Sequence, residues 1–113
     1  MNRPAIRILR NTLPILAASF LLTAPLRADD AAALYKSKCT ACHATDGSGD
    51  TAAGKAMKAP DLRSEEVQKQ TDAQLVDSTA NGKGKKMPAY KDKLTGDQIQ
   101  QLVAYIRELA KKK

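Results

Sequence analysis

The chain has 113 residues, of which 42% are hydrophobic, 27% charged and 4% aromatic, a length that suits one domain. Its two cysteines are too few for a disulfide-dense scaffold, and its longest apolar stretch, residues 13–26, is shorter than the about 20 residues of a membrane-spanning helix. The short apolar stretch excludes a polytopic membrane protein, and the clear helical periodicity excludes a long disordered chain. With a formal net charge of +7, the sequence indicates a small, basic, helical protein.

Residues 1–28 have the layout of a secretory signal peptide. Three arginines precede the apolar stretch, no acidic residue occurs before Asp29, and the small residue Ala28 ends the segment. We therefore expect cleavage after Ala28, export to the periplasm and a mature domain over residues 29–113. An uncleaved N-terminal anchor is the alternative.

Much of the positive charge leaves with that segment. Loss of its four arginines puts 15 basic residues against 12 acidic ones, and three of those 15 form the tail at 111–113. Net charge alone then gives little support to nucleic-acid binding, and we expect no nucleic-acid partner. The remaining 85 residues hold three tyrosines and no tryptophan, so something besides their own side chains has to fill the interior.

The first half of this domain is predicted to hold one helix and a long loop. Two aspartates followed by three alanines favour a helix over about residues 30–42. Glycine, serine and aspartate favour a loop over 44–60, and Ser64 before two glutamates favours a short helical turn.

Two capping boxes predict the helices of the second half. Thr71 with Gln74 opens a helix that ends near residue 80, and Thr95 with Gln98 opens the final helix. The final helix has five apolar residues on one face: Ile99, Leu102, Val103, Ile106 and Leu109. Because no strand-like alternation occurs, the predicted fold class is all-α, with long loops that need something to order them.

Both cysteines and the only histidine lie in the segment Cys39-Thr-Ala-Cys42-His43. The pattern C-x-x-C-H is that of a c-type haem attachment site. On a helical turn Cys39 and His43 share a face, so two thiols can bond to the vinyl groups of one haem while the imidazole reaches its iron. The sequence predicts one haem c, attached through Cys39 and Cys42, with His43 as a metal ligand.

Three other uses of the cysteines explain less of the sequence. A thioredoxin-like redox pair normally has a βαβ context, which is missing. A zinc site needs further cysteine or histidine ligands, and the sequence has none. A structural disulfide between Cys39 and Cys42 would close a very short ring and order little of the chain.

The second iron ligand has to be another residue type, and Met87 is the predicted one. Pro88 biases Met87 toward an extended backbone, and Gly82 and Gly84 allow the chain to turn closely against a flat ring. Met57 is the alternative methionine, and an open or lysine-bound iron is the other alternative. Either methionine could also simply fill space in the core.

In its order of motifs the chain resembles the class I c-type cytochromes, in particular the small bacterial ones with one haem. The resemblance covers about residues 30–110 and rests on Leu34-Tyr35, Ala59-Pro60-Asp61-Leu62, Met87-Pro88-Ala89-Tyr90 and Leu102-Val-Ala-Tyr105-Ile106. It implies a small cytochrome c fold of about three to five helices wrapped around the haem, with the first and last helices crossing at Ala31 and Tyr105. It also implies that the Pro60 carbonyl accepts a hydrogen bond from the second ring nitrogen of His43 and fixes its tautomer.

An iron held by His43 and Met87 has no open position for a substrate, so we expect a one-electron carrier rather than an enzyme. These ligands raise the reduction potential. Five lysines at 83–93 predict a basic rim that docks on an acidic surface of a redox protein such as a membrane oxidase, reductase or dehydrogenase. The predicted protein is an exported monomer without stable membrane insertion. The alternatives are a haem peroxidase or gas sensor with a labile sixth ligand, and a fixed subunit of a larger complex.

Overall fold

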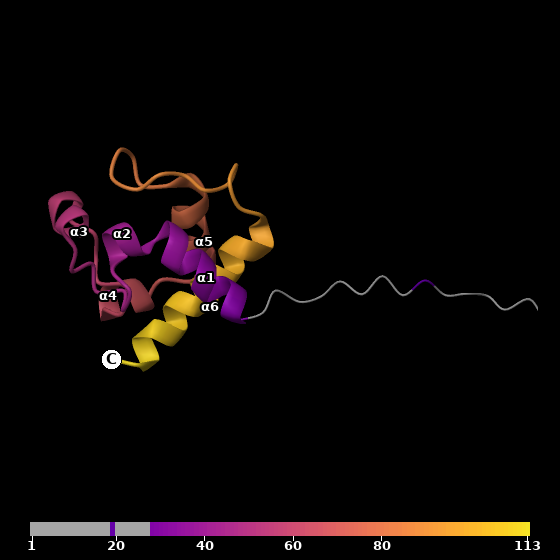
Figure 1. The fold of residues 1–113 in the computed structure, drawn as a ribbon, viewed down its shortest axis with the longest axis horizontal. Coiled ribbons are helices and arrows are strands. Elements are labelled where there is room, and N and C mark those ends of the chain that lie inside the picture. The colour runs from indigo at the N-terminus through magenta and orange to yellow at the C-terminus, as the bar shows by residue number, and fades with distance from the viewer. Residues whose placement is uncertain (1–18, 20–27) are drawn as a thin grey trace, which may run out of the picture.

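The computed structural model describes residue 19 and residues 28–113 (Figure 1). The predicted signal peptide therefore lies almost wholly outside the described residues, and its cleavage remains a prediction. The described part contains six helices, which confirms the all-α class: α1 (Ala28–Lys38), α2 (Thr40–His43), α3 (Ala52–Met57), α4 (Glu65–Gln68), α5 (Asp72–Asn81) and α6 (Gly96–Lys111). Within these residues no helix has the length and hydrophobicity to cross a membrane.

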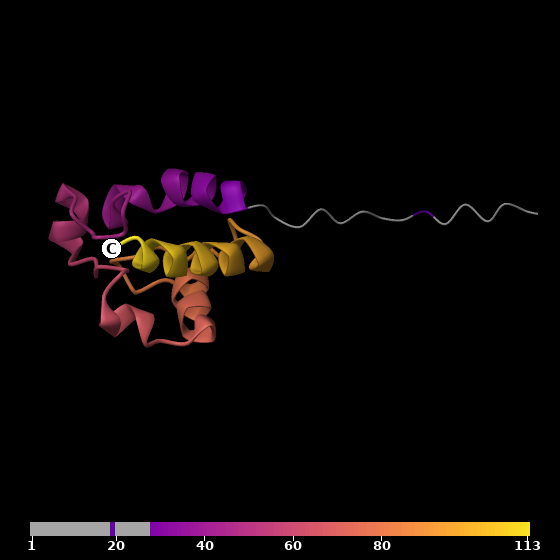
Figure 2. The same ribbon diagram turned by 90° about the horizontal axis from the view of Figure 1, so that it is seen from below.

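The first and last helices pack against each other. Figure 2 shows α6 between α1 on one side and the α4–α5 pair on the other. Ala31 and Tyr35 of α1 are almost fully buried, and the ring centroids of Tyr35 and Tyr105 lie 5.0 Å apart. A tilted aromatic pair at this distance stabilises a helix crossing beyond its buried area. Direct contact between Ala31 and Tyr105 stays a prediction.

Helix α6 supplies the largest share of the core. Four of the five residues on its predicted face are buried, and Ile106 is half-buried against the same cluster. The capping box at Thr95 is formed as predicted, as is the one at Thr71 that opens α5. The side chain of Arg107 links α6 to the connection between α4 and α5. It donates to the carbonyls of Gln68 at 2.9 Å and Gln70 at 2.6 Å, and it forms an ion pair with Asp72 at 2.9 Å.

The first half of the domain differs from the prediction in two places. The predicted helix over 30–42 is interrupted at Cys39, which leaves α2 as a separate turn. The predicted loop over 44–60 is wrong for Ala52–Met57, which form α3. The side chain of Thr51 caps α3 by accepting a hydrogen bond from the backbone of Gly54, and the helix packs on α2, a contact that local sequence does not reveal.

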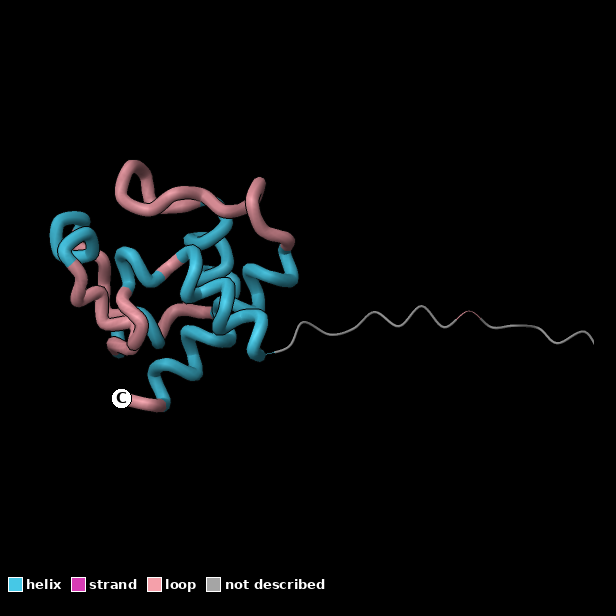
Figure 3. Tube along the Cα trace, in the orientation of Figure 1, coloured by secondary structure: helices cyan, strands magenta, loops and turns pink. Residues whose placement is uncertain are grey.

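Among residues 28–113, the longest irregular segment connects α5 to α6. Figure 3 shows it running along one side of the helices as a continuous loop. It begins at Gly82, whose φ of +76° is a left-handed conformation, and a side chain there would meet the backbone of Met87, Pro88 and Ala89. The predicted basic loop over residues 83–93 is therefore present and folds back on its own start.

Candidate functional site

The described residues enclose an apolar cavity of about 340 Å³ that opens at the surface. It has the size of a pocket for a small-molecule cofactor. All the residues that the sequence predicted to attach the haem, to bind its iron or to orient His43 line this one cavity: Cys39, Cys42, His43, Met57, Pro60 and Met87. Its apolar wall comes mainly from Leu62, Val67, Leu75, Leu102 and Ile106, so α4, α5 and α6 all face the cavity opposite α2.

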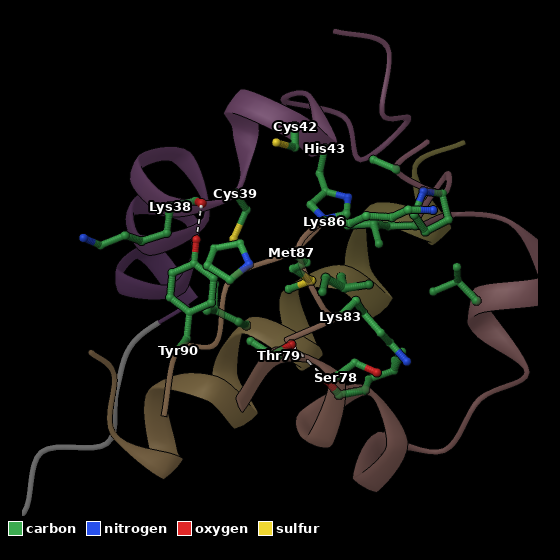
Figure 4. A pocket seen from close by; sticks show the side chains of 18 of the residues that line it. Lys38, Cys39, Cys42, His43, Ser78, Thr79, Lys83, Lys86, Met87 and Tyr90 are labelled. Atoms are coloured by element: carbon green, nitrogen blue, oxygen red, sulfur yellow. Dashed lines mark hydrogen bonds between the residues drawn. The ribbon is translucent and has the colours of Figure 1, made fainter. Parts of the chain in front are cut away.

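Helix α2 holds the attachment motif in the predicted geometry. The backbone N–H of His43 donates to the carbonyl of Cys39 at 2.9 Å, which closes one helical turn. Figure 4 shows the Cys39 sulfur and the His43 ring on the same side of that turn. Both cysteines are free thiols.

The chemistry of Cys39 does not suit a redox pair. Burial raises the pKa of its thiol to about 11, whereas a reactive redox thiol has a lowered pKa. Within residues 28–113 the structure also holds no group of three or more histidine, cysteine or acidic side chains placed to bind a metal ion. Cys39 is thus a protonated thiol at the edge of an apolar cavity that Cys42 also lines.

His43 carries a buried polar atom without a partner. Its Nδ1 is buried and makes no hydrogen bond of acceptable geometry. Burial lowers the pKa of His43, and the nearby backbone of Pro60 opposes that shift. A neutral imidazole is the form that binds a metal ion, commonly with its other nitrogen donating to a backbone carbonyl. Pro60 lines the same cavity, and a hydrogen bond from Nδ1 to its carbonyl stays a prediction.

The loop between α5 and α6 presents Met87 to the same cavity. The Met87 carbonyl accepts a hydrogen bond from the backbone of Lys83 at 3.0 Å, and the Tyr90 hydroxyl donates to the carbonyl of Lys38 at 3.0 Å. These two bonds close the loop on itself and fasten it to α1. Figure 4 shows Met87 and the His43 ring within the same cavity, one on the loop and the other on α2.

The positive charge around the cavity comes from more than one segment. Lys83 and Lys86 of the predicted basic loop line the cavity, and so do Lys38 and Lys58, which sequence reasoning did not place there. Their nearness to Cys39 and Met57 in the chain was the available signal. Lys93 instead lies over the Tyr90 ring, with Nζ 5.6 Å from the centroid.

The residues present fit a haem. A haem is a flat, largely apolar ring with a central iron, and the cavity offers apolar walls, two thiols at one edge, an imidazole with an unpaired nitrogen and a thioether from a separate segment. Each of these features matches one part of that cofactor.

Comparisons with known proteins agree with this fit. The family model described as cytochrome c oxidase, cbb3-type, subunit III matches residues 26–106. Cytochrome c6 of Leptolyngbya boryana is 38% identical over 86 residues, which are 74% of this chain and 96% of that protein. The cbb3-type oxidase subunit CcoP of Azospirillum brasilense is 33% identical over 99 residues, which are 81% of this chain but 34% of the subunit. The solved KustC0563 c-type cytochrome has a TM-score of 0.66 at 29% identity, covering 70% of this chain and 95% of that one.

Proposed function

The chain belongs to the class I c-type cytochromes, as a small protein with a single haem c, and we propose that it carries single electrons between redox partners in the periplasm. The observation that carries this proposal is the meeting of His43 and Met87 in one apolar cavity beside both cysteines. Export rests on the signal-like layout of residues 1–28.

We assign the haem-binding roles by residue. Cys39 and Cys42 attach the cofactor, His43 and Met87 bind its iron, and the Pro60 carbonyl orients His43. The bound haem supplies a metal centre that gains and loses one electron, with a potential raised by histidine and methionine ligation. With His43 and Met87 both bound to the iron, no position would be left for a substrate, and the protein would act as a carrier rather than as an enzyme.

The surrounding residues adjust the potential and exclude water. The apolar wall formed by α4, α5 and α6 raises the cost of the more highly charged ferric state. Lysines act in the same direction, since one unit charge about 10 Å from the iron contributes about 1.7 kcal/mol at an effective dielectric of about 20, or about 70 mV before salt screening. Exposed lysines contribute less than this.

The electron acceptor is proposed to be an oxidase with an acidic docking surface. The family model and one relative are of oxidase subunits, and Lys38, Lys58, Lys83 and Lys86 line the cavity and are exposed to solvent. Redox encounters are small and transient, and opposite charges steer them. We expect the four lysines, called here the basic rim, to face that partner.

A second candidate is a fixed subunit of such an oxidase, which the match to subunit III favours. The chain spans about a third of the CcoP subunit but nearly all of the cytochrome c6. The match to cytochrome c6 supports a free carrier. Size-exclusion chromatography of the native protein separates the two, because a free carrier elutes alone.

A spectrum of the exported protein tests the proposal. We expect a pyridine haemochrome with both vinyl groups saturated and, in the ferric protein, the weak far-red band of a sulfur–iron bond. A folded protein without colour would refute haem binding. Carbon monoxide or cyanide binding without a lag, with the far-red band absent, would instead support a haem peroxidase or gas sensor.

A further inference from the structure

Helix α3 is joined to the haem-attachment turn by a single hydroxyl group. The Thr51 hydroxyl donates to the carbonyl of Ala41 at 2.8 Å, lies 3.3 Å from the carbonyl of Cys42, and accepts from the backbone of Gly54 at 2.8 Å. A hydroxyl has one proton and two lone pairs, so this group bonds two helices at once. Thr51 therefore holds the start of α3 against the two residues that precede His43.

The other two threonine caps of the fold lack this second role. Thr71 and Thr95 accept from the backbone of Gln74 and Gln98, each at 3.1 Å, within capping boxes of their own helices. All three threonines stabilise a helix start in the same way. Only Thr51 among them bonds to the segment that carries the cysteines and the histidine, which makes Thr71 a matched control.

The same short helix also holds the Pro60 segment. The carbonyl of Gly54 accepts from the backbone of Ala59 at 2.8 Å, one residue before Pro60. Gly54 is buried, and a side chain there would overlap the carbonyl oxygens of Cys42 and Gly49. The start of α3 thus contacts two backbone segments, at Cys42 just before His43 and at Ala59 just before Pro60.

We propose that Thr51 is a positioning residue, which fixes the attachment turn relative to the Pro60 carbonyl and thereby helps to set the reduction potential. The proposal rests on haem binding at His43. A carbonyl held toward Nδ1 increases the electron donation of the imidazole and favours the ferric state. Loss of the Thr51 hydroxyl loosens both segments, so that in the haem-loaded protein the Pro60 carbonyl is held less firmly toward Nδ1 and the equilibrium shifts toward the ferrous state.

The test compares three variants of the holo-protein by spectroelectrochemical titration: Thr51→Val, Thr51→Ser and Thr71→Val. None of them changes the net charge. We expect Thr51→Val to increase the ferrous-to-ferric ratio at a fixed ambient potential by roughly threefold to tenfold, where tenfold equals about 59 mV. Thr51→Ser keeps the hydroxyl and should keep the wild-type potential. Thr71→Val should melt at a lower temperature because a cap is lost, with no change of potential.

Two outcomes would overturn the proposal. One is a wild-type potential in folded, haem-loaded Thr51→Val, and the other is an equal shift in Thr71→Val. If Thr51→Val does not accumulate, the pair Thr51→Ala and Thr51→Ser gives the same comparison. The pyridine haemochrome spectrum distinguishes failure of the proposed function from failure of this inference. A colourless protein would refute haem binding, whereas a red Thr51→Val protein with an unchanged potential would refute only the role of Thr51.

Discussion

Removal of the haem is expected to unfold most of this protein. The perturbation is the double variant Cys39→Ala/Cys42→Ala, produced without haem so that the cavity stays without its cofactor. Two of the three most deeply buried large side chains, Tyr35 and Leu102, line that cavity. The cofactor therefore lies at the centre of the core, and its loss removes contacts from the residues that hold the helices together.

The size of the effect follows from the cavity volume. At about 24 cal/mol per Å³, a cavity of about 340 Å³ corresponds to about 8 kcal/mol, an upper bound because the cavity opens at the surface. A domain of about 85 residues has a free energy of unfolding of about 4–13 kcal/mol. The loss is thus as large as the whole stability expected for such a domain.

Far-UV circular dichroism during heating measures this directly. We expect the holo-protein to melt cooperatively and the haem-free double variant to show low helicity without a cooperative transition. Addition of free haem to the variant, which keeps His43, should restore part of the helicity. A haem-free chain that melts cooperatively near the midpoint of the holo-protein would refute the reasoning, because its own side chains would then complete the core.

Three further predictions concern single residues. Met87→Leu should abolish the far-red band and allow carbon monoxide to bind without a lag, whereas Met57→Leu should leave both properties unchanged; the reverse result would exchange the assignments. Lys86→Glu should slow electron transfer to an acidic partner at low salt, and the difference from wild type should vanish as ionic strength rises; rates that do not depend on salt would exclude electrostatic steering. Arg107→Leu should lower the free energy of unfolding by about 2–3 kcal/mol in a urea titration, since its guanidinium donates to two backbone carbonyls and a carboxylate; an unchanged midpoint would contradict this.

The parts of the fold that sequence predicted are those that depend on neighbours in the chain. The capping boxes at Thr71 and Thr95 were found because both partners lie three residues apart. The face of α6 was found because helical periodicity places its apolar residues together. The C-x-x-C-H motif was equally local, since one helical turn brings Cys39 and His43 to the same side.

The parts that sequence missed depend on contacts between distant segments. Helix α3 has a threonine cap, but Gly54 stands where a capping box has glutamate or glutamine, so the local signal is weak. Its stability comes from the bonds of Thr51 to α2 and from the close approach of Gly54 to the Cys42 carbonyl. Likewise Lys38 and Lys58 join the basic rim only because the helices meet around one cavity.

The choice between the two methionines shows what the tertiary structure adds to the sequence. Both line the cavity, so nearness alone does not distinguish them. Met57 ends α3 and is 45% exposed, whereas Met87 is half-buried with its carbonyl bonded to Lys83, and its loop is fastened to α1 through Tyr90. A weak thioether–iron bond persists only where the backbone already holds the sulfur in place, since ordering a free side chain costs entropy. These restraints favour Met87 as the ligand and leave Met57 as an exposed apolar side chain beside the basic rim.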